Sequence, residues 1–189
     1  MKKLDIDSSW TVFLDRDGVI NKKIENDYIK TWDDFSFTNK ALLAIAVLSK
    51  CFSKILVVTN QRGVGKELMT EERLIIIHEK MCEEIKLESG RIDKIYYCTD
   101  KLDSSEFRKP NVGMALTAKR DYPEINFSKS IIIGDSITDM LFGKRLGMTC
   151  FYIGEEIPLE ESGIIDAKFD SLYDCALYSK KKINDRIFN

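Results

Sequence analysis

The stretch Trp10-Thr-Val-Phe-Leu-Asp15-Arg-Asp17-Gly18-Val-Ile-Asn21 joins an apolar run to two carboxylates and a glycine. Its centre, residues 12–14, lacks polar alternation, which predicts a strand buried on both faces of a parallel sheet. Open α/β sheets bind ligands at the carboxyl ends of such strands, so Asp15 and Asp17 fall where chemistry is expected. Gly18 then lets the backbone leave the strand in a conformation that a side chain would disfavour. An isolated Asp-x-Asp pair also occurs as a plain polar turn, so its interpretation depends on the rest of the chain.

The composition is that of an ordinary globular domain. The chain has 189 residues, of which 44% are hydrophobic and 32% charged, and this predicts a single domain over residues 1–189. The formal net charge is −2, so we expect no nucleic-acid partner, and the dense basic cluster 180–182 is typical of a solvated helix end. No segment approaches the roughly 20 apolar residues of a membrane span, and residues 1–5 do not lead into a signal-peptide core. We therefore expect a cytoplasmic protein that does not bind membranes.

Cysteine and histidine usage gives no metal motif. The five cysteines are odd in number and widely spaced, as is typical of reduced, buried thiols. With a single histidine, His78, and no Cys-x-x-Cys pair, a zinc site of His and Cys ligands is not expected. His78 follows three isoleucines in a predicted helix, which favours packing or solvent exposure over catalysis. The cysteines are Cys51, Cys82, Cys98, Cys150 and Cys175.

Strands and helices alternate along the chain. Apolar, β-rich runs predict further strands at residues 54–59, 92–98, 130–134 and 149–153, with a short apolar piece at 167–169. Helical periodicity predicts helices at 39–50, capped by Asn39, at 70–88, at 113–121, at 137–146, capped at its end by Gly147, and from about 171. Residues 22–37 are expected to form an ordered loop, and residues 60–66 a glycine-bearing loop. The alternation predicts a Rossmann-like α/β sandwich of three layers, with a central, mainly parallel sheet.

Polar side chains lie at the ends of several predicted strands or in the adjoining loops. In a parallel sheet these ends open on one edge, so the side chains are expected to meet. Carboxylates that hold Mg²⁺, donors that hold phosphate oxygens, and a nucleophile are what phosphoryl transfer requires. The residues concerned are Asp15 and Asp17, Thr59 with Asn60, Lys109, and Asp135 with Asp139.

These residues, in this order across about residues 10–150, resemble the four motifs of the haloacid dehalogenase superfamily of phosphohydrolases. A finer likeness is to the branch of histidinol-phosphate and heptose-bisphosphate phosphatases. The resemblance implies a Mg²⁺-dependent phosphatase that acts on a small phosphorylated metabolite. The segments that follow Asp17 and Thr59 are too short for a full cap domain, so we expect none. The finer likeness rests on Asp15-Arg-Asp-Gly-Val-Ile-Asn21, Thr59-Asn-Gln61, Gly63-Val-Gly65, Arg108-Lys-Pro110 and Gly134-Asp-Ser-x-x-Asp139-Met.

The resemblance implies that the two acids after the first strand carry the chemistry. Asp15 would be the nucleophile that forms an aspartyl-phosphate. Asp17 would protonate the leaving alkoxide and later take a proton from water. For this role we expect the pKa of Asp17 to be raised by the neighbouring carboxylate and by partial burial, while Asp15 stays ionised against the metal.

The remaining motif residues would hold the metal and the phosphate. Mg²⁺ would bind the Asp15 carboxylate, the Asp17 main-chain carbonyl and Asp135. Thr59 and the Asn60 backbone would bind the transferring phosphoryl group. Lys109 would compensate charge in the transition state, and Asp139 would orient Lys109 or a metal-bound water. Each also has a plainer interpretation, as a strand end, a surface cation or a first-turn acid.

Four further residues are candidates for contacts beyond the reacting phosphate. In the resembled branch the arginine that corresponds to Arg108 reaches substrate phosphate, although a plain surface arginine is an open alternative. Gln61, Arg62 and Asn21 are candidates of the same kind.

The chain departs from the branch at its zinc loop. Many members carry Cys-x-His and then Cys-x-Cys directly before Arg-Lys-Pro, whereas Cys98-Thr99-Asp100 keeps only the first cysteine. We therefore expect no zinc. Heptose 1,7-bisphosphate is the favoured substrate and histidinol phosphate the alternative, with a nucleic-acid 3′-phosphatase or a non-catalytic phosphate- or metal-binding module as rivals of other classes. A monomer or small homo-oligomer is expected.

Overall fold

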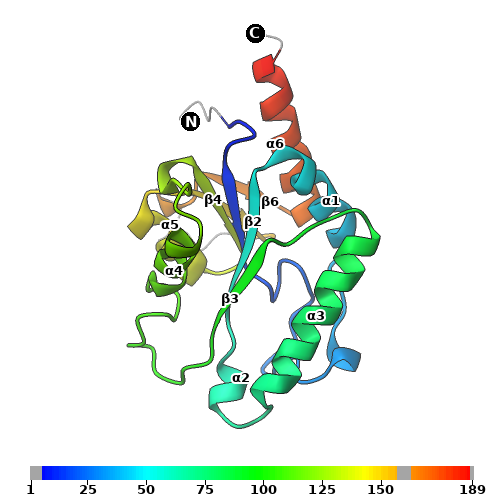
Figure 1. The fold of residues 1–189 in the computed structure, drawn as a ribbon, viewed down its shortest axis with the longest axis vertical. Coiled ribbons are helices and arrows are strands. Elements are labelled where there is room, and N and C mark those ends of the chain that lie inside the picture. Colours follow the sequence, from blue (N-terminus) through cyan, green and yellow to red (C-terminus); the bar gives the residue numbers. More distant parts are fainter. Residues whose placement is uncertain (1–5, 157–162, 188–189) are drawn as a thin grey trace.

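A parallel sheet forms the centre of the computed structural model, which describes residues 6–156 and 163–187 (Figure 1). In these residues the sheet has six strands in the order β3-β2-β1-β4-β5-β6. From β1 the chain builds outward through β2 and β3, and then returns to add β4 on the other side, so β1 and β4 flank a topological switch point. The strands are β1 (Thr11–Leu14), β2 (Lys54–Asn60), β3 (Lys94–Cys98), β4 (Ser130–Gly134), β5 (Thr149–Ile153) and β6 (Ala167–Phe169).

Helices cover both faces of the sheet. On one face lie α1 (Ala41–Cys51), α3 (Glu71–Leu87) and α6 (Leu172–Ile187), and on the other lie α4 (Gly113–Asp121) and α5 (Ile137–Leu146) (Figure 1). Alternate side chains of β1 enter different cores, since Val12 and Leu14 pack on the first face and Phe13 on the second. The predicted three-layer α/β fold, with β1 buried on both faces, is confirmed.

The structure corrects several local predictions. Asn39 does not cap α1: Lys40 occupies the cap position with φ 57°. The reason is that Thr38 is held by hydrogen bonds to Val19 and Ile20 and accepts the amide of Ala41, which fixes the entry to the helix. The expected loops at 22–37 and 60–66 contain a 3-10 turn (Trp32–Asp34) and a short helix, α2 (Arg62–Gly65). Gly147 ends α5 in the left-handed region, as predicted.

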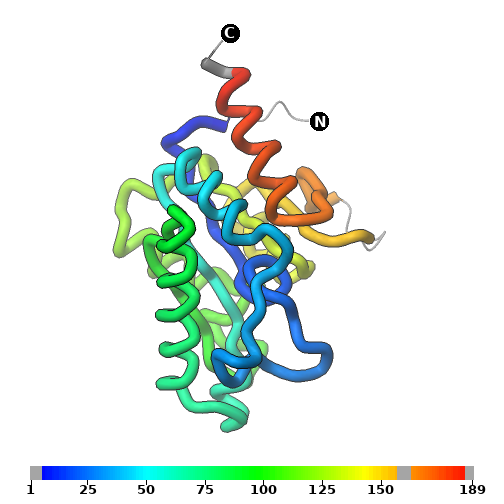
Figure 2. Tube along the Cα trace, turned by 90° about the vertical axis from the view of Figure 1, so that its right-hand side faces the viewer, coloured from blue at the N-terminus to red at the C-terminus, as the bar shows by residue number. Residues whose placement is uncertain are grey.

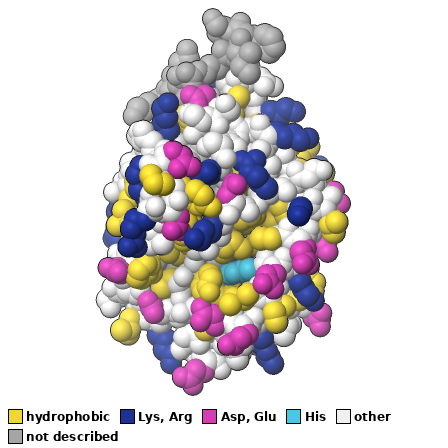
Figure 3. All heavy atoms as spheres, viewed as in Figure 1, with side chains coloured by type: hydrophobic (Ala, Val, Ile, Leu, Met, Phe, Trp, Pro, Cys, Tyr) yellow, Lys and Arg dark blue, Asp and Glu magenta, His cyan; other side chains and the backbone are white. Residues whose placement is uncertain are grey.

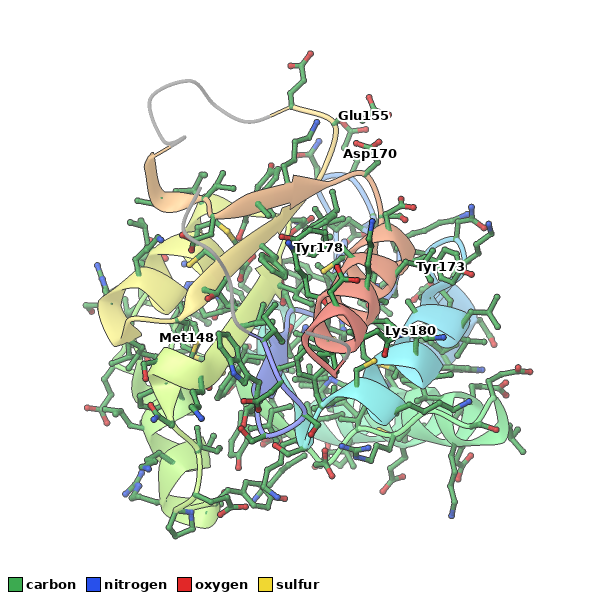
Figure 4. The ribbon with its side chains drawn as sticks, turned by 90° about the horizontal axis from the view of Figure 1, so that it is seen from above. Met148, Glu155, Asp170, Tyr173, Tyr178 and Lys180 are labelled. Carbon is green, nitrogen blue, oxygen red and sulfur yellow. The ribbon has the colours of Figure 1, made fainter. Side chains whose placement is uncertain are left out.

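The C-terminal helix packs at the opposite end of the molecule from the short helix α2. Figure 4 shows Tyr173 and Tyr178 on α6, and the ring of Tyr178 lies 5.9 Å from that of Phe151 and 5.2 Å from that of Phe169. At the other end of the molecule, α2 follows the carboxyl end of β2 (Figure 2). The carboxyl edge of the sheet therefore faces away from the end at which α6 packs. Among the described helices, none has the length and apolar character needed to cross a bilayer.

Candidate active site

Three carboxylates meet at the carboxyl edge of the sheet. Asp15 follows β1, Asp135 follows β4, and Asp139 lies in the first turn of α5. Each contributes an oxygen to a group whose atoms all lie within 4.8 Å of one another, and the described residues contain no second group of this kind. Gly18, with φ 89°, passes so close that a Cβ there would collide with the Asp135 carboxylate.

This cluster fits a magnesium ion. Carboxylate oxygens are the ligands that Mg²⁺ prefers. Asp135 Oδ1 is buried and has no hydrogen-bond partner in the described part of the chain. An unsatisfied carboxylate oxygen beside a second carboxylate is costly unless a cation balances it.

Lys109 is the buried cation of the site. Its Nζ lies 2.9 Å from Asp15 Oδ1 and 2.5 Å from Asp139 Oδ1, and the residue is only 3% exposed. Asn60 holds the Lys109 backbone through two hydrogen bonds, of 3.0 and 3.1 Å, and Ser136 holds the other oxygen of Asp139. Burial lowers the pKa of Lys109, but the carboxylates of Asp139 and Asp15 outweigh burial and raise it. Lys109 is therefore a fixed positive charge.

Asp15 sits among like charges. Burial raises the pKa of Asp15 to about 7, with repulsion from Asp139 and Asp135 adding to the rise and Lys109 opposing it. Its Oδ1 also accepts the Arg16 amide at 2.7 Å. These values describe the site without a cation, so the expectation that Asp15 is ionised against a bound metal stays a prediction.

Asp17 turns away from that cluster. Arg16 binds both of its oxygens, at 2.8 and 3.0 Å, and the amides of Asn21 and Gln61 donate to it at 2.9 and 2.8 Å. Burial raises the pKa of Asp17, but Arg16 and the hydrogen bonds from Asn21 and Gln61 together lower it below its usual value. The prediction of a raised pKa is therefore wrong for this state, because the side chain faces a guanidinium and not the neighbouring carboxylate.

A cavity of about 220 Å³ brings most of the predicted residues together. A second cavity, of about 170 Å³, shares Asp17, Lys23 and Asn60 with it and reaches Tyr28 in the loop after β1. Thr59 lines the first cavity, and its hydroxyl accepts a hydrogen bond from Gln61. The first cavity is lined by Asp15, Asp17, Lys23, Thr59, Asn60, Lys109, Ser136, Thr138 and Asp139.

The four candidates for outlying contacts divide into two pairs. Asn21 and Gln61 are buried, and their side-chain amides donate hydrogen bonds to Asp17. Their contacts with substrate stay a prediction. Arg62 and Arg108 instead converge on Asp103, a residue of the shortened loop. These two guanidinium groups meet at one carboxylate oxygen.

Sequence reasoning missed two features of the site. Lys23 Nζ lies 2.5 Å from Asp135 Oδ2 and lines the main cavity, but nothing in the predicted loop distinguished it from neighbouring lysines. The second feature is a buried hydrogen bond between Arg16 and His78. The composition of α3 gives no sign of this contact.

Comparisons with known proteins identify the family to which the chain belongs. Residues 11–156 match the family described as polynucleotide kinase 3 phosphatase. The D-glycero-alpha-D-manno-heptose-1,7-bisphosphate 7-phosphatase of Mycobacterium bovis is 32% identical over 174 residues, which cover 89% of this chain and 90% of that protein. The D-glycero-beta-D-manno-heptose-1,7-bisphosphate 7-phosphatase of Vibrio cholerae is 32% identical over 178 residues, which cover 88% and 94%.

A solved structure shares the fold. The D,D-heptose 1,7-bisphosphate phosphatase of B. bronchiseptica, complexed with magnesium and phosphate, aligns with a TM-score of 0.81 and 24% identity, over 92% of this chain and 99% of that one. Fold and site together define a phosphatase of the haloacid dehalogenase superfamily. The chain belongs to the polynucleotide kinase 3 phosphatase family and, within it, to the heptose-bisphosphate branch. The resemblance found in the sequence is confirmed.

Proposed function

We propose that this phosphatase removes one phosphate from D-glycero-D-manno-heptose 1,7-bisphosphate, with Asp15 as the nucleophile. The observation that carries the proposal is the cluster of Asp15, Asp135 and Asp139 around the buried Lys109 at the sheet edge. The names of the relatives above, which specify the 7-phosphate, support position 7 as the site of cleavage.

The reaction proceeds in two displacements. An Asp15 carboxylate oxygen attacks phosphorus, the bond from phosphorus to the sugar oxygen breaks, and Asp17 gives its proton to the departing alkoxide. Water then attacks the aspartyl-phosphate, Asp17 takes its proton, and phosphate leaves. Asp17 is ionised in the substrate-free state, and the arriving phosphate dianion raises its pKa, because added negative charge favours the protonated acid.

The chain's own donors stabilise the transferring group. Lys109 offsets negative charge in the transition state, and Thr59 with the Asn60 backbone binds phosphoryl oxygens. Asp15, Asp135 and the Asp17 main-chain carbonyl would hold Mg²⁺. When bound, the ion offsets the repulsion between the Asp15 carboxylate and the phosphate. Asp139, whose two oxygens face Lys109 and Ser136, sets the position of Lys109.

The arginine pair favours a bisphosphate substrate. Arg62 and Arg108 both reach Oδ1 of Asp103, a residue whose side chain is 85% exposed. Arg62 Nε and Arg108 Nη1 are buried with no hydrogen-bond partner in the described residues. Two guanidinium groups that converge on one oxyanion are suited to a second phosphate. Histidinol phosphate has no second phosphate to offer them.

The other expectations are retained as part of the proposal. We propose that the chain binds no zinc; in support, Cys98 alone remains of the cysteines of the branch's zinc loop, and its Sγ lies 3.6 Å from Asp100 and 3.7 Å from Ser105. We do not propose a nucleic-acid substrate, because the formal net charge of −2 gives no excess of basic residues and, on the face in Figure 3, Lys and Arg side chains are interspersed with Asp and Glu. The chain acts as one domain without a separate cap, as a monomer or small homo-oligomer in the cytoplasm.

Phosphate release by the purified protein tests the proposal. Heptose 1,7-bisphosphate, histidinol phosphate and a 3′-phosphorylated oligonucleotide are compared with Mg²⁺ and with a chelator, and Asp15→Asn is the control variant. We expect chelator-sensitive release from the bisphosphate, with the 1-phosphate left intact, and none from the control. A preference for histidinol phosphate or the oligonucleotide would overturn the substrate, and equal activity in Asp15→Asn would overturn the nucleophile.

A further inference from the structure

Arg16 lies between the two motif aspartates, yet its side chain runs into the interior. The residue is 1% exposed. Its Nη2 donates to both oxygens of Asp17, and its Nε lies 3.3 Å from Oδ1, so the guanidinium fork fixes the plane of that carboxylate. Its main-chain carbonyl accepts the amides of Val19, Ile20 and Asn21. One residue thus fixes both the turn after β1 and the orientation of Asp17.

The other arm of that guanidinium reaches α3. Arg16 Nη1 lies 3.1 Å from Nε2 of His78, a residue 62 positions further along the chain and only 6% exposed. The ring of His78 also lies beside that of Tyr97, with centroids 5.6 Å apart. The histidine is therefore packed on one side and hydrogen-bonded on the other.

The chemistry of the two groups fixes the role of the ring. A guanidinium can only donate hydrogen bonds, so Nε2 must accept, and the imidazole is neutral with its proton on Nδ1. Burial, with the positive charge of Arg16, lowers the pKa of His78 to about 3. His78 is consequently a permanent acceptor and not an acid or base.

We propose that His78 is a positioning residue for catalysis, which holds Arg16 so that the guanidinium presents the Asp17 carboxylate in the orientation needed for proton transfer. The inference rests on the proposed role of Asp17 as the general acid. An apolar side chain at position 78 would fill similar space but would leave Arg16 Nη1 without this acceptor. The guanidinium could then rotate away from its present orientation toward Asp17.

Three substitutions separate positioning from packing. In His78→Gln the side-chain oxygen can reach the place of Nε2, in His78→Asn it is too short, and in His78→Leu it is missing. Activity is measured as kcat/KM with two substrates: heptose 1,7-bisphosphate, whose alkoxide leaving group needs a proton, and p-nitrophenyl phosphate, whose phenolate leaves without one. Melting temperatures report whether each variant is folded.

We expect His78→Leu and His78→Asn to lose activity only with the substrate whose leaving group must receive a proton from Asp17. Their kcat/KM for the bisphosphate should fall by about 10-fold or more, up to the roughly 10²–10⁴-fold that general acid–base catalysis contributes in full, with KM little changed. Their kcat/KM for p-nitrophenyl phosphate should change by less than about threefold, and His78→Gln should stay near wild type on both substrates.

Asp17→Asn provides the reference for this pattern. If it loses activity equally on both substrates, the acid role fails and the inference falls with it. If Asp17→Asn loses kcat/KM only for the bisphosphate while His78→Leu and His78→Asn lose none selectively, the acid role of Asp17 is supported and His78 has only a structural role. If His78→Leu does not fold, the Gln and Asn variants decide, and equal activity in those two would overturn the proposal.

Discussion

Replacing Lys109 by Met tests the charge balance of the site. Methionine approximates the length of the side chain and removes its charge, so Asp15 and Asp139 lose the cation that lies 2.9 and 2.5 Å from them. Removing one partner of a buried ion pair costs about 3–5 kcal/mol. For a chain of this length, such a loss lowers the melting temperature of the metal-free protein by roughly 10 °C. Activity with Mg²⁺ should fall by about 10²–10³-fold in kcat, as for other lost transition-state donors.

Lys23→Met is the matched control. Lys23 pairs with Asp135 of the same cluster at 2.5 Å, but its side chain is 49% exposed. Exposed pairs are worth at most about 1 kcal/mol, so the melting temperature should move by no more than about 3 °C. The assay is thermal unfolding at pH 8 in chelator, repeated with Mg²⁺. The ion should reduce the difference in melting temperature between the two variants, because it balances the charge of the carboxylates.

The comparison has a clear negative outcome. Equal melting temperatures for the two metal-free variants would refute the reasoning, because the cost would then be independent of burial. A difference in melting temperature between the variants that increases with Mg²⁺ would contradict the placement of the ion at these carboxylates.

Other predictions concern the nucleophile, pH and the arginine pair. Asp15→Asn should abolish turnover while circular dichroism stays that of the native fold; full activity would remove the assignment. Burial raises the pKa of Asp15 from 3.8 to about 7, so the metal-free native state binds a proton that the unfolded chain has released, and the contribution of Asp15 to stability falls as pH rises from about 4 to 7. The difference in unfolding free energy between wild type and Asp15→Asn, measured by urea titration, should follow that window, and a difference that is flat with pH would contradict it. Arg108→Gln should raise KM for heptose 1,7-bisphosphate about tenfold, because a charge-assisted contact is lost, while KM for p-nitrophenyl phosphate stays constant; equal rises for both would place Arg108 outside the second-phosphate site.

The sheet could be read from the sequence because its strands are continuous apolar runs. Residues 12–14, 55–58 and 131–133 are buried on both faces of the sheet, as is typical of central parallel strands. The polar residues at the ends of these strands could then be predicted to lie together, because parallel strands share one carboxyl edge. The same argument predicts that Asp15, Asp135, Asp139 and Lys109 meet at one edge of the sheet, where the structure has them.

What the sequence could not supply were contacts between elements. Arg16 reads as a polar residue in an exposed turn, and only the approach of α3 gives its guanidinium an acceptor in His78. The pKa of Asp17 depends on that same inward rotation. Lys23 belongs to a loop without periodicity, so its pairing with Asp135 depends on tertiary structure alone.

The position of β1 beside β4 also has a consequence for how the chain folds. Thr11 pairs with Ser130, so Asp15 belongs to an N-terminal half of the sheet, whereas Asp135 and Asp139 belong to a C-terminal half. Contacts between segments so far apart in sequence form slowly, because a long loop must close first. The docking of the two halves is also the step that brings the carboxylates together against their mutual repulsion. A cation bound between these carboxylates would offset their repulsion. It would therefore stabilise the docked arrangement of the two halves as well as take part in the chemistry.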